Sequence, residues 1–251
     1  MLLAIDIGNS SVKFGIFDGE HLLSKFSIPT KRDSTADELK QAIQTNLDLP
    51  ITAAIICSVV PELNGPLTEF LSGAFGIEPV LVQNDFDFGM KIAYEPLSSI
   101  GTDRLVNAFA AATKYGAPCI VCSFGTATTI DAVGAGPEFL GGVIAPGMEI
   151  MAEALHHRTS QLPRIEIAKP ENVIGTSTLA AIQSGIFYGH IALAEGIIAR
   201  IKTELAPSDT KPKVIATGGF AAVIASESKA IDVVDENLLL DGLRLLFEQT
   251  N

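Results

Sequence analysis

The sequence predicts an α/β fold built from two copies of one domain plan. Short apolar, β-branched segments alternate with longer segments of helical spacing along the 251 residues. Each half of the chain also opens with two short strands around a glycine turn, IDIGNSSVKFGIF in the first half and CSFGTATTIDAVG in the second. Aligning these openings sets Asp6 opposite Ser123 and Gly8 opposite Gly125, which suggests a duplication.

The first half of the chain begins with three strands in succession, and the remaining segments alternate in type. Ser34 is the expected N-cap of the first helix, because apolar residues with helical spacing follow it. A later helix is expected to begin near Thr102 or Asp103 and to stop at Gly116. The other expected elements are strands at 2–6, 12–17, 21–28, 53–60 and 79–83, and helices at 34–47 and about 62–75.

The second half repeats the opening with strands expected at 119–123, 128–134 and 139–147. A long helix from about Ser177 to Glu204, a strand from 213 and a helix at 238–248 complete it. We therefore predict two domains, residues 1–115 and residues 116–251, each with one glycine turn.

Charge and composition exclude several classes of protein. The chain has 17 Lys and Arg against 29 Asp and Glu, a net charge of −12, which disfavours nucleic acid and anionic membranes as partners. The N-terminus lacks a basic segment before its apolar residues, and no apolar run reaches the roughly 20 residues that span a bilayer. We expect a cytoplasmic protein whose Cys57, Cys119 and Cys122 are buried thiols, with the last two on opposite faces of a strand.

The two glycine turns are suited to holding a phosphate chain. Such turns offer backbone N–H groups without an obstructing Cβ, together with Ser, Thr or Asn side chains. One such turn alone is most simply an ordinary hairpin. Two matched turns, with a further TGG at Thr217 to Gly219, favour a nucleotide site. His156 and His157 stand at an expected helix end and are interpreted as solvated.

Asp103 and Arg104 are the charged residues that are the best candidates for a role in catalysis or substrate binding. An acid in the first turn of a helix also simply complements the helix dipole. The functional alternative is that Asp103 accepts the proton of a substrate hydroxyl while Arg104 holds a negative group, as phosphoryl transfer requires.

Together these motifs resemble type III pantothenate kinases, which belong to the actin, Hsp70 and sugar-kinase superfamily. The similarity runs nearly end to end: DIGNSSVK resembles the first phosphate loop of the family, YEPLSSIGTDRLVNA its substrate stretch and FGTATTID its second phosphate loop. GGVIAPGMEIMAEAL and IGTSTLAAIQSGIFYG resemble its glycine-proline segment and the start of its long helix. The resemblance implies two actin-like (ribonuclease H-like) domains with a nucleotide cleft between them.

The resemblance also assigns site residues and an activity. ATP phosphorylates pantothenate to 4′-phosphopantothenate, the first step of coenzyme A biosynthesis, and Asp103 is the catalytic proton acceptor. Asp6 orients Mg²⁺ through water, and a homodimer is implied, with the long helix after Gly175 as its interface. The implied ATP contacts are Asp6, Ile7, Gly8, Asn9, Ser10, Ser11, Val12, Lys13 and Thr126. The implied pantothenate contacts are Tyr94, Gly101, Thr102, Asp103, Arg104 and Thr178.

Ser123 departs from the pattern of the family. Family members usually carry an Asp there, which ligates a monovalent cation, K⁺ or NH₄⁺. A neutral hydroxyl supplies no charge, so we expect the cation to bind weakly or not at all. This departure keeps open an alternative, a non-catalytic nucleotide-binding accessory protein of the same fold. A superfamily relative that uses another hydroxyl substrate is the third possibility.

Overall fold

The computed structural model describes residues 1–47, 49–206 and 210–250, which form two compact units. Unit 1 contains Met1–Met90, Tyr94–Ala110 and the described chain from Asn237 onward, and unit 2 contains Lys91–Ala93 and Ala111–Glu236. The chain thus returns to unit 1 at its C-terminal end. The predicted domains, residues 1–115 and residues 116–251, stay a prediction.

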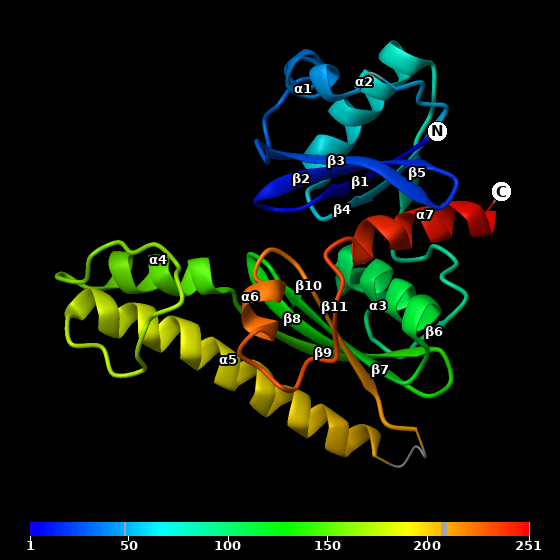
Figure 1. Ribbon diagram of the computed structural model, residues 1–251. Helices are drawn as coiled ribbons and strands as arrows, with labels where there is room; N and C mark the ends of the chain where they lie inside the picture. Colours follow the sequence, from blue (N-terminus) through cyan, green and yellow to red (C-terminus); the bar gives the residue numbers. More distant parts are fainter. Residues whose placement is uncertain (48, 207–209, 251) are drawn as a thin grey trace. The chain divides into compact units, whose positions relative to one another are not determined.

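Unit 1 is built on a five-stranded sheet of order β3-β2-β1-β4-β5 (Figure 1). Its strands are β1 (Leu2–Ile7), β2 (Ser11–Asp18), β3 (His21–Pro29), β4 (Ala53–Ser58) and β5 (Val80–Val82). The first three strands are antiparallel neighbours, as predicted, whereas β4 and β5 run parallel to β1.

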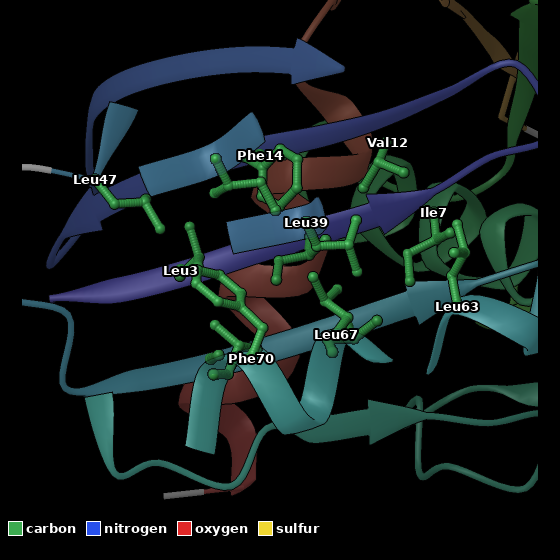
Figure 2. Packing of buried hydrophobic residues seen from close by; sticks show 14 of the residues in the cluster. Leu3, Ile7, Val12, Phe14, Leu39, Leu47, Leu63, Leu67 and Phe70 are labelled. Atoms are coloured by element: carbon green, nitrogen blue, oxygen red, sulfur yellow. The ribbon is translucent and has the colours of Figure 1, made fainter. Parts of the chain in front are cut away.

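Helices α1 (Ala36–Ile43) and α2 (Asn64–Phe75) cover one face of this sheet. Figure 2 shows their apolar side chains packed against alternate residues of the strands, such as Leu3 and Ile7 of β1. Helix α7 (Leu238–Thr250) contacts β1, β2 and β4, and its Gly242 lies close to Val106 of α3 (Thr102–Tyr115). The short 3₁₀ turns are η1 (Gln44–Asn46), η2 (Pro61–Leu63) and η3 (Leu97–Ser99).

The N-cap of α1 is Thr35, so the prediction of Ser34 is wrong by one residue. The hydroxyl of Thr35 accepts from the backbone N–H of Glu38 at 3.3 Å, and the Glu38 carboxylate accepts from the N–H of Thr35 at 3.0 Å. This reciprocal pair requires Glu or Gln three residues after the cap. Thr35 satisfies that spacing and Ser34 does not, because Asp37 stands three residues after Ser34.

Unit 2 is built on a six-stranded sheet of order β11-β10-β7-β8-β9-β6 (Figure 1). Its strands are β6 (Lys91–Ile92), β7 (Cys119–Phe124), β8 (Ala127–Val133), β9 (Glu138–Pro146), β10 (Lys213–Thr217) and β11 (Val233–Val234). Helices α4 (Met148–Arg158), α5 (Thr178–Leu205) and α6 (Ala221–Ala225) pack against one face. The structure confirms the long helix, with Ser177 as its N-cap.

The two sheets confirm the duplication. In each unit the first strand pairs antiparallel with the second, the second antiparallel with the third, and the first parallel with the fourth. Asp6 and Ser123 occupy the same place, the fifth residue of a six-residue first strand. The alignment of the two openings is therefore an alignment of equivalent strands.

The cysteines singled out in the sequence are buried, whereas the two histidines differ in exposure. All three cysteines are free thiols; Cys122 packs into the core under α4 and α5, and Cys119 lies outside that cluster. His156 and His157 lie in the last turn of α4; His157 is exposed, as predicted, but His156 is half-buried, with its Nδ1 2.9 Å from the carbonyl oxygen of Leu162. Among the described residues, no helix combines the length and apolarity needed to cross a bilayer.

Candidate active site

The register of the first sheet places three reactive side chains on one face. Asp6 of β1 is paired with Lys13 of β2 and with Cys57 of β4. Paired residues point to the same side of a sheet, and alternate residues point to opposite sides. Their neighbours Ile5 and Ile56 belong to the core under α1 and α2, so the three side chains point away from those helices.

Asp6 is a buried carboxylate with one nearby cation. Its side chain is 8% exposed, and its Oδ2 lies 3.6 Å from Nζ of Lys13. Burial raises the pKa of Asp6, Lys13 lowers it and the charge of Asp103 adds to the rise, with a net pKa of about 6.

Helix α3 begins over the same face of the sheet. The hydroxyl of Thr102 donates to the carbonyl of Ser58 at 3.1 Å and accepts from the thiol of Cys57 at 3.3 Å. Burial, followed by the charges of Asp6 and Asp103, raises the pKa of Cys57 well above its ordinary value, so this thiol stays protonated. These contacts fix the first turn of α3 to the end of β4.

Asp103 stands in that first turn, where its charge contributes to the raised pKa of Asp6. Its Oδ1 accepts from the backbone N–H of Arg104 at 2.9 Å. Burial raises the pKa of Asp103, and the N–H and charge of Arg104 oppose the shift. A Cβ at Gly101 would collide with Oδ1, so the absence of a side chain there makes room for the carboxylate.

The first turn of α3 carries a cation, and the segment that precedes α3 carries an aromatic ring. The guanidinium of Arg104, which is 5% exposed, lies over the ring of Tyr94 at 5.7 Å from its centroid. The side-chain amide of Asn84 donates to the carbonyls of Leu97 at 3.1 Å and Ile100 at 2.5 Å. The amide therefore holds the loop between Tyr94 and Gly101 in place.

The predicted first phosphate loop is the turn between β1 and β2. The N–H of Gly8 donates to the carbonyl of Ser11 at 3.1 Å, which closes the turn. Asn9 at its tip is exposed, and its backbone N–H has no acceptor among the described residues. An exposed N–H of this kind is a ready donor to a phosphate oxygen.

The second phosphate loop lies in unit 2, between β7 and β8. Its backbone is approached closely by glycines, because a Cβ at Gly147 would collide with the carbonyl of Thr126 and a Cβ at Gly218 with that of Phe124. Gly218 also has a φ of +93°, which favours glycine. The TGG sequence is thus a support of this loop, a role that the sequence did not indicate.

The predicted residues divide between the two units. The structure brings Asp6, Lys13 and Asp103 together in unit 1, with Arg104 and Tyr94 alongside. The unit also contains the other predicted contacts of its loop and helix, Ile7, Gly8, Asn9, Ser10, Ser11, Val12, Gly101 and Thr102. Ser123, Thr126 and Thr178 belong to unit 2, where Thr178 is the exposed first residue of α5.

Sequence reasoning missed several supporting residues. Cys57 and Ser58 were assigned only to a strand, because nothing in the sequence states that β4 pairs with β1. Asn84 lies in a polar segment without a recognisable motif. The available signal was position, because residues at the carboxyl ends of parallel strands meet at one edge of a sheet.

The donors in unit 1 suit a magnesium ion that arrives with a nucleotide. Mg²⁺ prefers oxygen ligands and is commonly bound by one or two carboxylates, water and phosphate oxygens. Asp6 supplies a buried carboxylate and Asp103 a second one nearby. A divalent cation would also compensate for the burial that now raises the pKa of Asp6.

The arrangement provides the parts of a phosphoryl-transfer site. It contains a loop with a free N–H, a lysine, a buried carboxylate suited to magnesium and a second carboxylate with a raised pKa. Such a carboxylate accepts a proton more readily than an ordinary aspartate at neutral pH. The same set of groups suits transfer from a nucleotide to an alcohol.

Comparisons with known proteins agree with this geometry. The family model described as type III pantothenate kinase matches residues 2–200. A type III pantothenate kinase from Halalkalibacterium halodurans is 41% identical over 99% of both chains, and one from Geobacter sulfurreducens is 44% identical over 99% of both.

Solved structures show the same fold at lower identity. A Campylobacter jejuni protein whose name places it in the Baf family of transcriptional activators has a TM-score of 0.62 and 19% identity, covering 99% of this chain and 98% of that one. A polyphosphate/ATP-glucomannokinase from Arthrobacter has a TM-score of 0.53 and 16% identity, covering 100% and 99%. The fold is therefore the two-domain actin-like fold, and the chain belongs to the type III pantothenate kinase family.

Proposed function

We propose that this protein transfers the γ-phosphoryl group of ATP to the hydroxyl of pantothenate, giving ADP and 4′-phosphopantothenate, the first step of coenzyme A biosynthesis. Sequence identities of 41% and 44% to type III pantothenate kinases, each over 99% of the chain, support this choice of substrates. The observation that carries the chemistry is the Asp103 carboxylate in the first turn of α3, which Thr102 ties to the end of β4 and to Cys57, the register partner of Asp6. We infer that the protein acts in the cytoplasm. The negative net charge of the chain disfavours nucleic acid and membranes as partners.

Asp103 acts as the proton acceptor. As the pantothenate oxygen bonds to the γ-phosphorus, the bond from that phosphorus to the bridging oxygen of ADP breaks, and the hydroxyl proton passes to Asp103. The raised pKa of Asp103 favours this transfer. Gly101 keeps the carboxylate accessible, and the contacts of Thr102 hold the helix that carries it.

ATP binds to the first phosphate loop, from Asp6 to Lys13. The free N–H of Asn9 donates to a phosphate oxygen, and Lys13 adds positive charge where the transferred group develops negative charge. Asp6 would hold Mg²⁺ through water, and Mg²⁺ supplies charge neutralisation of the phosphates when it is bound. Thr126 of the second loop makes a further ATP contact.

Pantothenate binds along the segment from Tyr94 to Arg104. Pantothenate carries a carboxylate, and a guanidinium is the side chain best suited to hold one. The stacking on Tyr94 fixes the guanidinium of Arg104, whereas Gly101 and Thr102 line the approach to Asp103. Thr178 contributes a hydroxyl from the start of α5.

The monovalent cation site is weakened by Ser123. This residue is equivalent to Asp6 in the duplicated strand order, and it is half-buried. Its register partners are Thr129 of β8 and Thr217 of β10. Three hydroxyl-bearing residues offer oxygen ligands without a negative charge, so K⁺ or NH₄⁺ binds less tightly than at a carboxylate.

The protein is a homodimer formed through unit 2. Large apolar residues are exposed on α4, at the start of α5 and in the segment before it: Ile150 38%, Leu155 37%, Leu179 47%, Val173 63% and Ile174 83%. An open pocket of about 540 Å³ lies between these helices, lined by Leu155, Ile182 and Ile186 among others. Contiguous exposed apolar surface marks an interface.

A substrate panel tests the proposed function. Purified protein with ATP and Mg²⁺ is given pantothenate, glucose, mannose or no acceptor, and ADP formation is measured. Pantothenate-dependent ADP formation is the expected result. ADP formation without an acceptor, or with a sugar only, would assign another activity, and nucleotide binding without turnover would favour the accessory role.

A further inference from the structure

We propose that Thr30 and Arg32, which follow β3, position the first phosphate loop for ATP. They lie outside every predicted contact, and together they reach all three residues at the tip of that loop. This inference deepens the proposed function, because it rests on the loop being the site of ATP phosphates.

Thr30 holds the backbone of the loop at two points. Its hydroxyl donates to the carbonyl of Gly8 at 2.6 Å, and its N–H donates to the carbonyl of Ser10 at 3.1 Å. Both bonds use carbonyls, so the N–H of Asn9 between them remains unused. The two hydrogen bonds therefore fix the turn and leave the N–H of Asn9 available to a phosphate oxygen.

Arg32 holds the side chain of Asn9. Its Nη2 donates to Oδ1 of Asn9 at 2.9 Å, and its Nη1 lies 3.8 Å from Oε1 of Glu62. An amide whose oxygen is occupied presents its Nδ2 group, with two N–H donors, on the other side. Among the described residues this Nδ2 donates to none, so it is available to a phosphate oxygen.

The guanidinium suits this task better than an ammonium group. Its planar donors fix the plane of the amide through one nitrogen while another faces Glu62. Lys31, the adjacent cation, is turned to a different partner, because its Nζ contacts Oε1 of Glu38 at 2.8 Å. Lys31 is therefore a matched control for charge.

Steady-state kinetics and calorimetry with Mg²⁺ and ADP test the proposal. Arg32→Gln and Thr30→Val are each expected to raise the KM for ATP and the Kd for ADP about three- to tenfold, the effect of one lost hydrogen bond. The KM for pantothenate is expected to stay unchanged. Thr30→Ser, which keeps the hydroxyl, and Lys31→Gln are expected to resemble the unmodified protein.

A double-mutant cycle shows whether Arg32 acts through Asn9. In an Asn9→Ala background, Arg32→Gln is expected to add little to the Kd for ADP. An undiminished effect in that background, unchanged ADP binding in both single variants, or an equal rise of both KM values would overturn the proposal. Calorimetry needs no pantothenate, so a failed phosphorylation assay would leave this test intact and would count against the proposed function alone.

Discussion

Nζ of Lys13 lies 3.6 Å from Oδ2 of Asp6, across the two strands that enclose the first phosphate loop. The lysine side chain is 50% exposed and the aspartate 8% exposed. The cation therefore compensates only in part for the burial of the carboxylate, whose pKa stays raised to about 6 from 3.8. The ionised form of Asp6 is therefore disfavoured in the site, and the binding of a further cation would stabilise it.

Stability should depend on pH through Asp6. Between pH 3.8 and about 6 the folded chain keeps a proton that the unfolded chain has lost. The contribution of Asp6 to stability therefore falls as pH rises through this window, by about 3 kcal/mol, and stays low above it. Denaturant unfolding should show Asp6→Asn gaining stability over the unmodified protein at pH 8 and not at pH 4. A difference that is independent of pH would contradict the assignment.

A methyl group at Gly101 should damage catalysis more than folding. Its Cβ would collide with Oδ1 of Asp103 and displace the proton acceptor. We expect Gly101→Ala to lower kcat by about 10²-fold, a size typical of a misplaced acid–base group, with thermal unfolding little changed. Gly73→Ala in α2 meets open space and should keep full activity. Equal activity of the two variants would remove Gly101 from the site.

Potassium should stimulate this protein little. Ser123 offers no charge at the position equivalent to Asp6, and a carboxylate there would attract a monovalent cation. Turnover measured against KCl, with choline chloride holding ionic strength constant, is expected to be nearly flat for the unmodified protein. Ser123→Asp should restore a saturable increase. Strong K⁺ activation of the unmodified protein would show that other oxygen ligands suffice.

A charge in the exposed apolar surface of unit 2 should separate the dimer. Ile174 is 83% exposed before α5, so an acidic residue there costs little in the monomer and much in a buried interface. Light scattering after size exclusion should find Ile174→Asp at half the mass of the unmodified protein. Leu23→Asp, which changes an exposed leucine of β3, is the control and should leave the mass unchanged. A monomeric unmodified protein would contradict the interface.

Much of the fold could be predicted because local patterns agree with the final structure. The turn residues Gly8 and Gly125 stand after buried apolar strands, and the two openings occupy equivalent places in the two sheets. The prediction of Ser34 as the N-cap is wrong because two hydroxyl residues, Ser34 and Thr35, stand next to each other. Only the hydrogen bonds with Glu38 select Thr35.

The supporting residues of the site could not be predicted, because they depend on contacts distant in sequence. Cys57 contacts Thr102 because β4 lies beside β1 in the sheet. Thr30 contacts Gly8 because β3 runs back along β2 and ends near the turn between β1 and β2. Neither contact has a local signature. The family resemblance alone assigned Asp6 and Asp103 to one site, since 97 positions separate them in the sequence.

The most direct test of the central claim is the identity of the product formed with and without the Asp103 carboxylate. Protein, Mg²⁺-ATP and pantothenate are incubated, and the products are resolved by ³¹P NMR and mass spectrometry. The unmodified protein should give ADP and 4′-phosphopantothenate in equal amounts. Asp103→Asn should bind ADP normally and form the product at least about 10²-fold more slowly. Undiminished phosphopantothenate formation by Asp103→Asn would contradict its role as proton acceptor.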